Sequence, residues 1–261
     1  MKKVLMCVSA HFSIEYSINP WMDVNNQVDH ETAMRQWEAV YDAYKTSGVT
    51  IELIDQKKGL PDMVFTANGG IVYGNTFIVS NHRYKERKGE ELLFGKWFAS
   101  RGYKIHHLRN HQSGEGDALF FQDVLYMGWG FRSDRESHQE VGKILGVETV
   151  SLKLINPYFY DFDTAFCPIG DKAILYYPEA FDDESKAILA ELPHALPIDG
   201  SEANGFIGNS VYINRELFVE YLDAKLEEQL ATIDVKPRVF DMSEFKKSGG
   251  GIKCITLYLD H

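Results

Sequence analysis

The chain has 261 residues, of which 44% are apolar, 25% charged and 13% aromatic, a composition typical of a globular protein with a sizeable core. Its net charge of −11 at pH 7 argues against a nucleic-acid partner or an acidic membrane surface, because phosphate groups are bound by clustered lysine and arginine. The same charge favours a cationic small molecule.

The cysteines and apolar runs bear on compartment and cofactors. Cys7, Cys167 and Cys254 have the spacing of neither a disulfide framework nor a zinc site. Segment 1–8 begins like a secretory signal, but Ser9 interrupts its apolar run, and no run reaches membrane-spanning length. We expect a cytoplasmic protein that needs no metal or organic cofactor.

The predicted elements begin with a strand at 4–8, a helix at 30–46 and a strand at 50–54. In the helix, apolar side chains recur with a period near 3.6, at Ala33, Met34, Trp37, Val40, Tyr41 and Tyr44.

From residue 71 onward, one series of elements occurs four times. Two strand-like segments joined by a short turn open at intervals of 48, 46 and 46 residues, at Ile71, Leu119, Ala165 and Val211. A helix follows each pair, predicted at 90–100, 135–145, 183–192 and 216–230. A short strand closes each unit, at 103–108, 147–154, 194–198 and 237–241. In the fourth unit the second strand is either very short or merges into the helix.

The two ends of the chain supply a fifth unit. Segment 254–259 is strand-like, and with 4–8, 30–46 and 50–54 it completes another β-β-α-β series. A unit assembled from both ends predicts a closed ring, as in propellers. The fold class we predict is therefore α/β, a five-unit α/β-propeller in one domain, residues 1–261. A doubly wound parallel sheet fits less well, because paired hairpin strands precede each helix.

Polar residues and glycines collect at the joint before each unit, and in a pseudo-fivefold ring these joints converge near the axis. The same topological position carries Asn68, Asp117, Asp161, Asp163, Asn209 and Cys254. A thiol among acceptor carboxylates suits a planar cation with many N–H donors, which is a guanidinium. Turn residues are the alternative interpretation: we assign Asp62 and Asn204 to turns, and Thr164 and Asn209 fit turn caps as well.

Cys254 has the most distinctive surroundings of the three thiols. It comes shortly after Gly249, Gly250 and Gly251, whose lack of side chains allows backbone and ligand to approach closely. Cys7 and Cys167 lie inside apolar strand segments, as packing cysteines do. We therefore predict that Cys254 is the only functional thiol.

Four segments resemble, in order and spacing, motifs of the guanidino-group-modifying (pentein) superfamily: PDMVFTANGG, GEGDALF, YFYDFDTAF and GGIKCITL. That superfamily includes arginine and agmatine deiminases, dimethylarginine dimethylaminohydrolases and amidinotransferases, and its fold is an α/β-propeller. The arginine dihydrolase type is the most similar subgroup. In that subgroup the segment reads like VFTAN, with asparagine where deiminases have aspartate, and this chain has Asn68 at the same place.

The resemblance implies a role for each matched residue. Cys254 is implied to attack the guanidinium carbon, giving a covalent thiouronium that water hydrolyses to a ureido product. Asp117 and Asp163 are implied to clamp the guanidinium nitrogens, with Asn68 beside them. Three further residues match positions that hold the amino-acid end of the substrate: Asn19, Arg87 and Arg132. We count Cys254, Asp161 and Asp163 as catalytic candidates and add Asn209 to the substrate-binding ones.

Asp161 departs from the family pattern. Relatives read like FYHLDT, with a histidine as general acid and base, where this chain reads FYDFDT. A histidine titrates near neutral pH and, as a cation, favours a thiolate, whereas a carboxylate disfavours it. Asp161 can take over the proton transfers only if it holds a proton near neutral pH, which burial and like charges favour. His11 is the one histidine that we consider as a replacement.

Three functions are compatible with these residues. The first is a cysteine-dependent hydrolase of arginine or a related guanidino compound, and the second is an amidinotransferase that uses the same intermediate. The third is a catalytically silent binder of guanidino ligands, which loss of the histidine favours and retention of Cys254, Asp117 and Asp163 disfavours. The predicted partner is a small guanidino or ureido molecule, and the sequence leaves homo-oligomer formation open.

Overall fold

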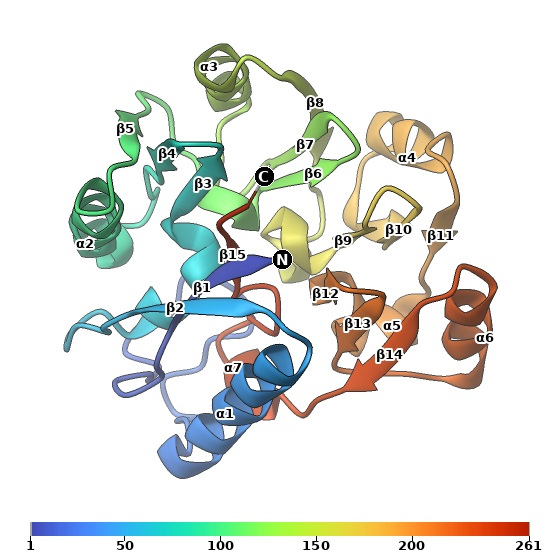
Figure 1. Ribbon diagram of the computed structural model, residues 1–261, viewed down its shortest axis with the longest axis horizontal. Coiled ribbons are helices and arrows are strands. Elements are labelled where there is room, and N and C mark those ends of the chain that lie inside the picture. Colours follow the sequence, from blue (N-terminus) through green and yellow to red (C-terminus); the bar gives the residue numbers. More distant parts are fainter. Residues whose placement is uncertain (1, 261) are drawn as a thin grey trace.

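The computed structural model describes residues 2–260, which form five three-stranded sheets. In Figure 1 the sheets surround the middle of the molecule, and the longer helices lie on the outside. In each sheet the central strand pairs antiparallel with one neighbour and parallel with the other. A hairpin followed by a helical crossover produces this mixed pattern.

Four sheets are each built from one continuous stretch of chain. Their strands, in chain order, are β3 (Gly70–Tyr73), β4 (Thr76–Val79) and β5 (Lys104–His107); β6 (Ala118–Phe121), β7 (Val124–Trp129) and β8 (Glu148–Lys153); β9 (Phe166–Ile169), β10 (Ala173–Tyr176) and β11 (Ala195–Pro197); β12 (Val211–Ile213), β13 (Glu216–Val219) and β14 (Lys236–Val239). The crossover helices are α2 (Lys88–Ala99), α3 (Arg135–Leu145), α4 (Asp183–Ala190) and α6 (Ala224–Thr232), and two short helices are α5 (Gly200–Asn204) and α7 (Ser243–Lys246).

The fifth sheet joins the two ends of the chain, as the sequence predicts. Strand β1 (Lys3–Cys7) pairs antiparallel with β15 (Leu257–Tyr258), with Val4 opposite Tyr258. It also pairs parallel with β2 (Thr50–Ile54) after the crossover α1 (His30–Thr46). Cys254 comes shortly before β15 in the chain. Strands β15 and β1 lie near the centre of the view in Figure 1.

Two predicted elements are wrong. The helix predicted at 216–230 begins only at Ala224, because residues 216–219 form β13, which pairs with strands on both sides. Leu217, Phe218 and Val219 are fully buried there, so a run of three apolar residues belongs to a central strand. The strand predicted at 254–259 covers only Leu257–Tyr258, because the residues before it form a turn that carries Cys254.

The cores lie between neighbouring sheets and the helices that cover them. The largest cluster includes Phe162, Phe166 and Phe181, and the stacked rings of Phe162 and Phe166 lie 4.5 Å apart. Within residues 2–260, no helix is both long and apolar enough to cross a membrane.

Candidate active site

The joints before the hairpins fold as short 3-10 turns, at Thr66–Gly69, Gly114–Gly116, Phe162–Thr164 and Ile207–Asn209. These turns bring the six joint residues of the sequence prediction into one buried region. Each has an exposed fraction of 3% or less: Asn68, Asp117, Asp161, Asp163, Asn209 and Cys254. The convergence predicted from the repeats is therefore present.

Asn209 holds the segment that carries the thiol. Its Oδ1 accepts hydrogen bonds from the backbone N–H groups of Lys253 (3.0 Å) and Cys254 (3.2 Å). Its Nδ2 donates to the Asp163 carbonyl oxygen (3.0 Å) and contacts Cys254 Sγ at 3.1 Å. Asn209 therefore fixes the thiol relative to Asp163. The sequence analysis considered Asn209 as a ligand contact or as a turn cap, and these hydrogen bonds show it holding the turn that carries Cys254.

The thiol faces a carboxylate at short range. Cys254 Sγ lies 3.4 Å from Asp163 Oδ2, within reach for a proton transfer. Burial, with the charge of Asp163 adding to it, raises the pKa of the Cys254 thiol well above its ordinary value. This shift favours the protonated thiol over the thiolate.

Asp163 and Asp117 carry carboxyl groups with raised pKa values. Burial first, and then the charge of Asp161, raises the pKa of Asp163 to about 7. The same two causes raise the pKa of Asp117 well above the usual range. Asp117 accepts hydrogen bonds from Ser133 Oγ (2.6 Å) and the Phe162 N–H (2.9 Å), so its carboxyl group is firmly oriented.

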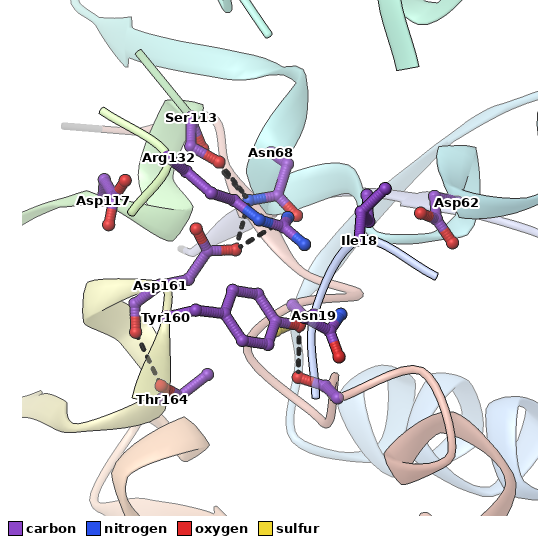
Figure 2. A network of polar contacts seen from close by, with 12 residues as sticks. Ile18, Asn19, Asp62, Asn68, Ser113, Asp117, Arg132, Tyr160, Asp161 and Thr164 are labelled. Atoms are coloured by element: carbon purple, nitrogen blue, oxygen red, sulfur yellow. Dashed lines mark hydrogen bonds and ion pairs between the residues drawn. The ribbon is translucent and has the colours of Figure 1, made fainter. Parts of the chain in front are cut away.

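Asp161 lies between a guanidinium and an amide. Its Oδ2 accepts from Arg132 Nη1 (3.2 Å) and from Asn68 Nδ2 (3.1 Å), as Figure 2 shows. The Arg132 guanidinium also lies 4.2 Å from the centre of the Tyr160 ring. The Tyr160 hydroxyl donates to the Gly249 carbonyl (2.8 Å) and so ties this group to the glycine loop.

Arg87 is engaged by protein acceptors at every nitrogen. It pairs with Glu90 through two parallel bonds of 3.0 and 2.8 Å, donates to Asn68 Oδ1 (2.9 Å) and to the Asp62 carbonyl (3.1 Å). The sequence analysis expected Arg87 to hold the substrate. In this structure it contacts Asn68 and Asp62, and the substrate role stays a prediction. Glu90, three residues later, is a partner of Arg87 that the sequence analysis did not name.

Asn19 connects its own segment to the glycine-rich segment that begins at Ser248. Its Nδ2 donates to the Ser248 carbonyl (3.0 Å) and its Oδ1 accepts from the Trp21 N–H (2.9 Å). His11, the candidate replacement for a histidine, is exposed and lines a surface hollow with His30 and Lys58. It is not part of the carboxylate cluster.

Asp62 is a site residue that the sequence analysis assigned to a turn. It lies in the 3-10 turn Pro61–Val64, is 2% exposed, and accepts from the Tyr16 hydroxyl (3.0 Å). Burial raises the pKa of its carboxyl group. The PDM segment alone does not indicate that Asp62 is buried, because the burial comes from Tyr16 and Arg87, which lie far away in the sequence. Asn204, also assigned to a turn, is exposed at the end of α5.

Several buried polar atoms near the site have no hydrogen-bond partner among the described residues, and they include Asp62 Oδ1, Asp161 Oδ1 and Arg132 Nε. A buried unpaired polar atom costs free energy, about 1–3 kcal/mol, unless a ligand or water pairs with it. Arg132 also lines a cavity of about 10 Å³ with Arg87, His82 and Ser113. Two carboxylate oxygens and one guanidinium N–H are thus available to a ligand. Within residues 2–260, no group of three or more His, Cys, Asp or Glu side chains is placed to hold a metal ion.

Comparison with known proteins assigns the family. The family model described as N,N dimethylarginine dimethylhydrolase, eukaryotic, matches residues 6–259. The chain belongs to this family. It is 37% identical to the N(G),N(G)-dimethylarginine dimethylaminohydrolase of Mycobacterium tuberculosis, over 98% of this chain and 85% of that protein. It is 38% identical to the bifunctional arginine dihydrolase/ornithine cyclodeaminase ArgZ of Synechocystis sp., over 98% of this chain but only 37% of ArgZ.

Solved structures show the same likeness in space. The N-terminal domain of ArgZ, in a cysteine-to-serine variant bound to substrate, superposes with a TM-score of 0.96 at 36% identity, covering 100% of this chain and 99% of that one. An asparagine-to-serine variant of the same domain, covalently bound to a reaction intermediate, gives a TM-score of 0.95 at 37% identity, covering 99% and 98%.

The raised pKa of Asp163 predicts a pH-dependent stability. The unfolded carboxyl titrates near 3.8 and the folded one near 7, so the stabilisation is complete below pH 3.8 and is lost as pH rises through 7. In urea unfolding, the wild type should be less stable at pH 8 than at pH 5 by up to about 2.7 kcal/mol from this group, because only the two pH units between pH 5 and the folded pKa contribute. Asp163→Asn removes the titrating group, so the free energy of unfolding of this variant should fall clearly less between pH 5 and pH 8. The exposed control Asp171→Asn should behave as the wild type does. Equal losses in wild type and Asp163→Asn would contradict the assignment.

Proposed function

We propose that this protein is a cysteine-dependent hydrolase of the guanidino group of arginine or a closely related guanidino amino acid. The observation that carries the proposal is the position of Cys254, whose thiol is buried 3.4 Å from Asp163 in a region that also holds Asp117 and Asp161. Carboxylates buried together repel each other, and a bound cation relieves that repulsion. The relatives named arginine dihydrolase and dimethylarginine dimethylaminohydrolase support the same substrate class.

The unpartnered atoms fit the other end of such a substrate. Asp62 Oδ1 can accept from an α-ammonium group, and Arg132 Nε can donate to an α-carboxylate. Arg87 lines the same cavity and holds Asn68, so it acts on the substrate through that amide. An α-amino acid with a guanidino end supplies a partner for each of these atoms. Asn68 and Asp117 flank the place of the guanidinium.

The first chemical step uses the proton of the thiol. A guanidinium beside Cys254 lowers the pKa of the thiol, whose proton passes to Asp163 Oδ2. The thiolate then attacks the guanidinium carbon, forming a C–S bond. The leaving nitrogen takes the proton back from Asp163 and departs as ammonia or an amine when its C–N bond breaks. A covalent thiouronium on Cys254 remains, a step supported by the ArgZ domain with a covalently bound intermediate.

The second step needs a base for water. Asp161 carries an unpartnered Oδ1, while its Oδ2 stays bound to Arg132 and Asn68. Water transfers a proton to Asp161 Oδ1, and the resulting hydroxide adds to the carbon. The C–S bond then breaks, the proton on Asp161 passes to the Cys254 thiolate, and the remaining hydroxyl proton leaves with the released ammonia or amine as its cation. The product is a ureido amino acid. Asp161 thus takes the part of the family's histidine in hydrolysis, and Asp163 takes its part in the first step.

The ion pair of Asp161 with Arg132 supports a second candidate, the silent binder. In that case Asp161 serves only to hold Arg132, and the guanidino ligand is bound without turnover. An amidinotransferase would differ in the second step alone, because an amine replaces water.

We further propose that residues 1–261 form one five-unit α/β-propeller domain located in the cytoplasm. The pairing of β1 with β15 supports a closed ring. The three free and buried cysteines, Cys7, Cys167 and Cys254, suit a reducing compartment.

The direct test of the proposed function is product analysis with arginine and methylated arginines. Wild type should release ammonia or an amine together with a ureido amino acid, and Cys254→Ser should reduce this at least about 1000-fold, because a hydroxyl is a far weaker nucleophile here. The matched control Cys167→Ser changes a buried thiol away from the site and should keep turnover within about threefold. Binding of arginine by wild type without any product would instead establish the silent binder.

The role of Asp161 has its own test. Asp161→Asn keeps the acceptor for Arg132 and loses the base, so the first step should proceed and a covalent adduct should accumulate on Cys254, visible by mass spectrometry of the intact protein. Asp161→His should restore hydrolysis and raise its rate near neutral pH. If Asp161→Asn turns over as fast as wild type and Asp161→His brings no gain, Asp161 is not the base.

A further inference from the structure

Glu220 follows β13 directly and contacts the segment that carries the nucleophile. Its Oε1 accepts a hydrogen bond from the Ile252 N–H at 3.2 Å. The same carboxyl group lies against Gly251, where a Cβ atom would come within 1.7 Å of Glu220 Oε1 and 2.9 Å of Asn209 Oδ1. The close approach of these two side chains therefore requires a glycine at position 251.

The backbone held by Glu220 also contacts the thiol. The Gly251 carbonyl accepts from the Ile255 N–H (3.2 Å), so residues 251–255 form a single tight turn. The backbone of Gly251 opposes the effect of burial on the Cys254 thiol and lowers its pKa. One peptide segment thus connects the Glu220 carboxyl group to Cys254.

Glu220 and Asn209 hold this turn from two neighbouring strands. In the hairpin of β12 and β13, Val211 lies opposite Phe218, and continuing that register places Glu220 next to Asn209. Asn209 holds the Lys253 and Cys254 N–H groups, while Glu220 holds the preceding Ile252 N–H. Three successive backbone donors therefore have side-chain acceptors on one hairpin.

We propose that Glu220 is a positioning residue for Cys254, because its hydrogen bond to the Ile252 N–H and its contact with Gly251 fix the turn 251–255 that carries the thiol. The inference rests on the proposed role of Cys254 as nucleophile. Glu220 acts as a hydrogen-bond acceptor, and its negative charge is not required. Burial raises the pKa of its carboxyl group well above the usual range, and a neutral acid still accepts through its carbonyl oxygen. Glutamine offers the same acceptor at the same distance.

The test measures the reactivity of Cys254 with 2-chloroacetamidine, a small cationic alkylating reagent, at saturating and subsaturating concentrations. Mass spectrometry of peptides locates the label, and kcat and KM for arginine are measured in parallel. Glu220→Ala and Glu220→Asp, whose shorter side chain cannot reach the Ile252 N–H, should slow labelling and lower kcat by about tenfold or more, with KM changed by less than about threefold. Glu220→Gln should keep both rates within about threefold of wild type, and the exposed control Glu228→Gln should change neither.

Each outcome decides the proposal. Labelling of folded Glu220→Asp or Glu220→Ala at the wild-type rate would overturn it. Labelling of Glu220→Gln as slow as that of Glu220→Asp would overturn the acceptor role. A thermal melt identifies variants that do not fold, and Glu220→Asp, which stays polar and of similar size, keeps the test valid if Glu220→Ala does not fold. Failure of the proposed function gives a different result, because wild type would then produce no ureido product while the labelling rates still compare the variants.

Discussion

The site depends on one electrostatic constraint, which is that a thiol and several carboxyl groups are buried together with too little positive charge to balance them. Arg132 pairs with Asp161, and Lys253 donates to Glu115. Asp163, which lies beside Cys254 Sγ, and the buried Asp117 form no ion pair within residues 2–260. In a medium of low polarity this arrangement keeps protons on the thiol and on the acids. A guanidinium is the group that reverses it, since its planar fork of N–H donors pairs with several carboxylates at once. Under the proposed function, the ligand itself therefore activates the Cys254 thiol.

Neutral hydrogen-bond donors and acceptors hold this unstable charge arrangement in place. Asn68 bridges Arg87 and Asp161, and Asn209 bridges Asp163 and the Cys254 backbone. An amide can do this without adding charge, because it offers donors and acceptors together. The two amides come from the 3-10 turns that precede two of the hairpins. Each turn leads directly into the first strand of its sheet, so the sheet holds the turn in place. Rigid elements thus carry the site, which is what a reaction with tight geometric demands needs.

The sequence predicted the parts of the structure that depend on local pattern. Repeated hairpins and helices appear in the spacing of apolar residues and glycines, and the joint residues Asn68, Asp117, Asp163, Asn209 and Cys254 could be placed near one another from the order of the repeats alone. The helix predicted at 216–230 failed because a short buried strand followed by a helix has the apolar content of one longer helix.

Contacts between distant segments could not be predicted from the sequence. Asp62 is a site residue only because Tyr16 and Arg87 bury it, and no motif connects these three positions. Arg132 was expected to be free for a ligand, yet it shares its guanidinium with Asp161, the position at which the chain departs from its relatives' histidine. Glu220 belongs to no motif that the sequence analysis identified, and its contact with Gly251 depends on how two distant parts of the chain pack together.

The most direct measurement of the central claim compares two reagents of similar size on wild-type protein at pH 7. One is 2-chloroacetamidine, which carries a positive charge, and the other is 2-chloroacetamide, which is neutral. Each labelling rate at Cys254 is divided by the rate of the same reagent with glutathione, which removes the difference in intrinsic reactivity. If the carboxylates hold the thiol protonated until a cation enters, the cationic reagent should be favoured by at least about 100-fold, a difference of roughly 2.7 kcal/mol in activation free energy. Equal normalised rates would show that Cys254 is reactive without a cation and would contradict the account.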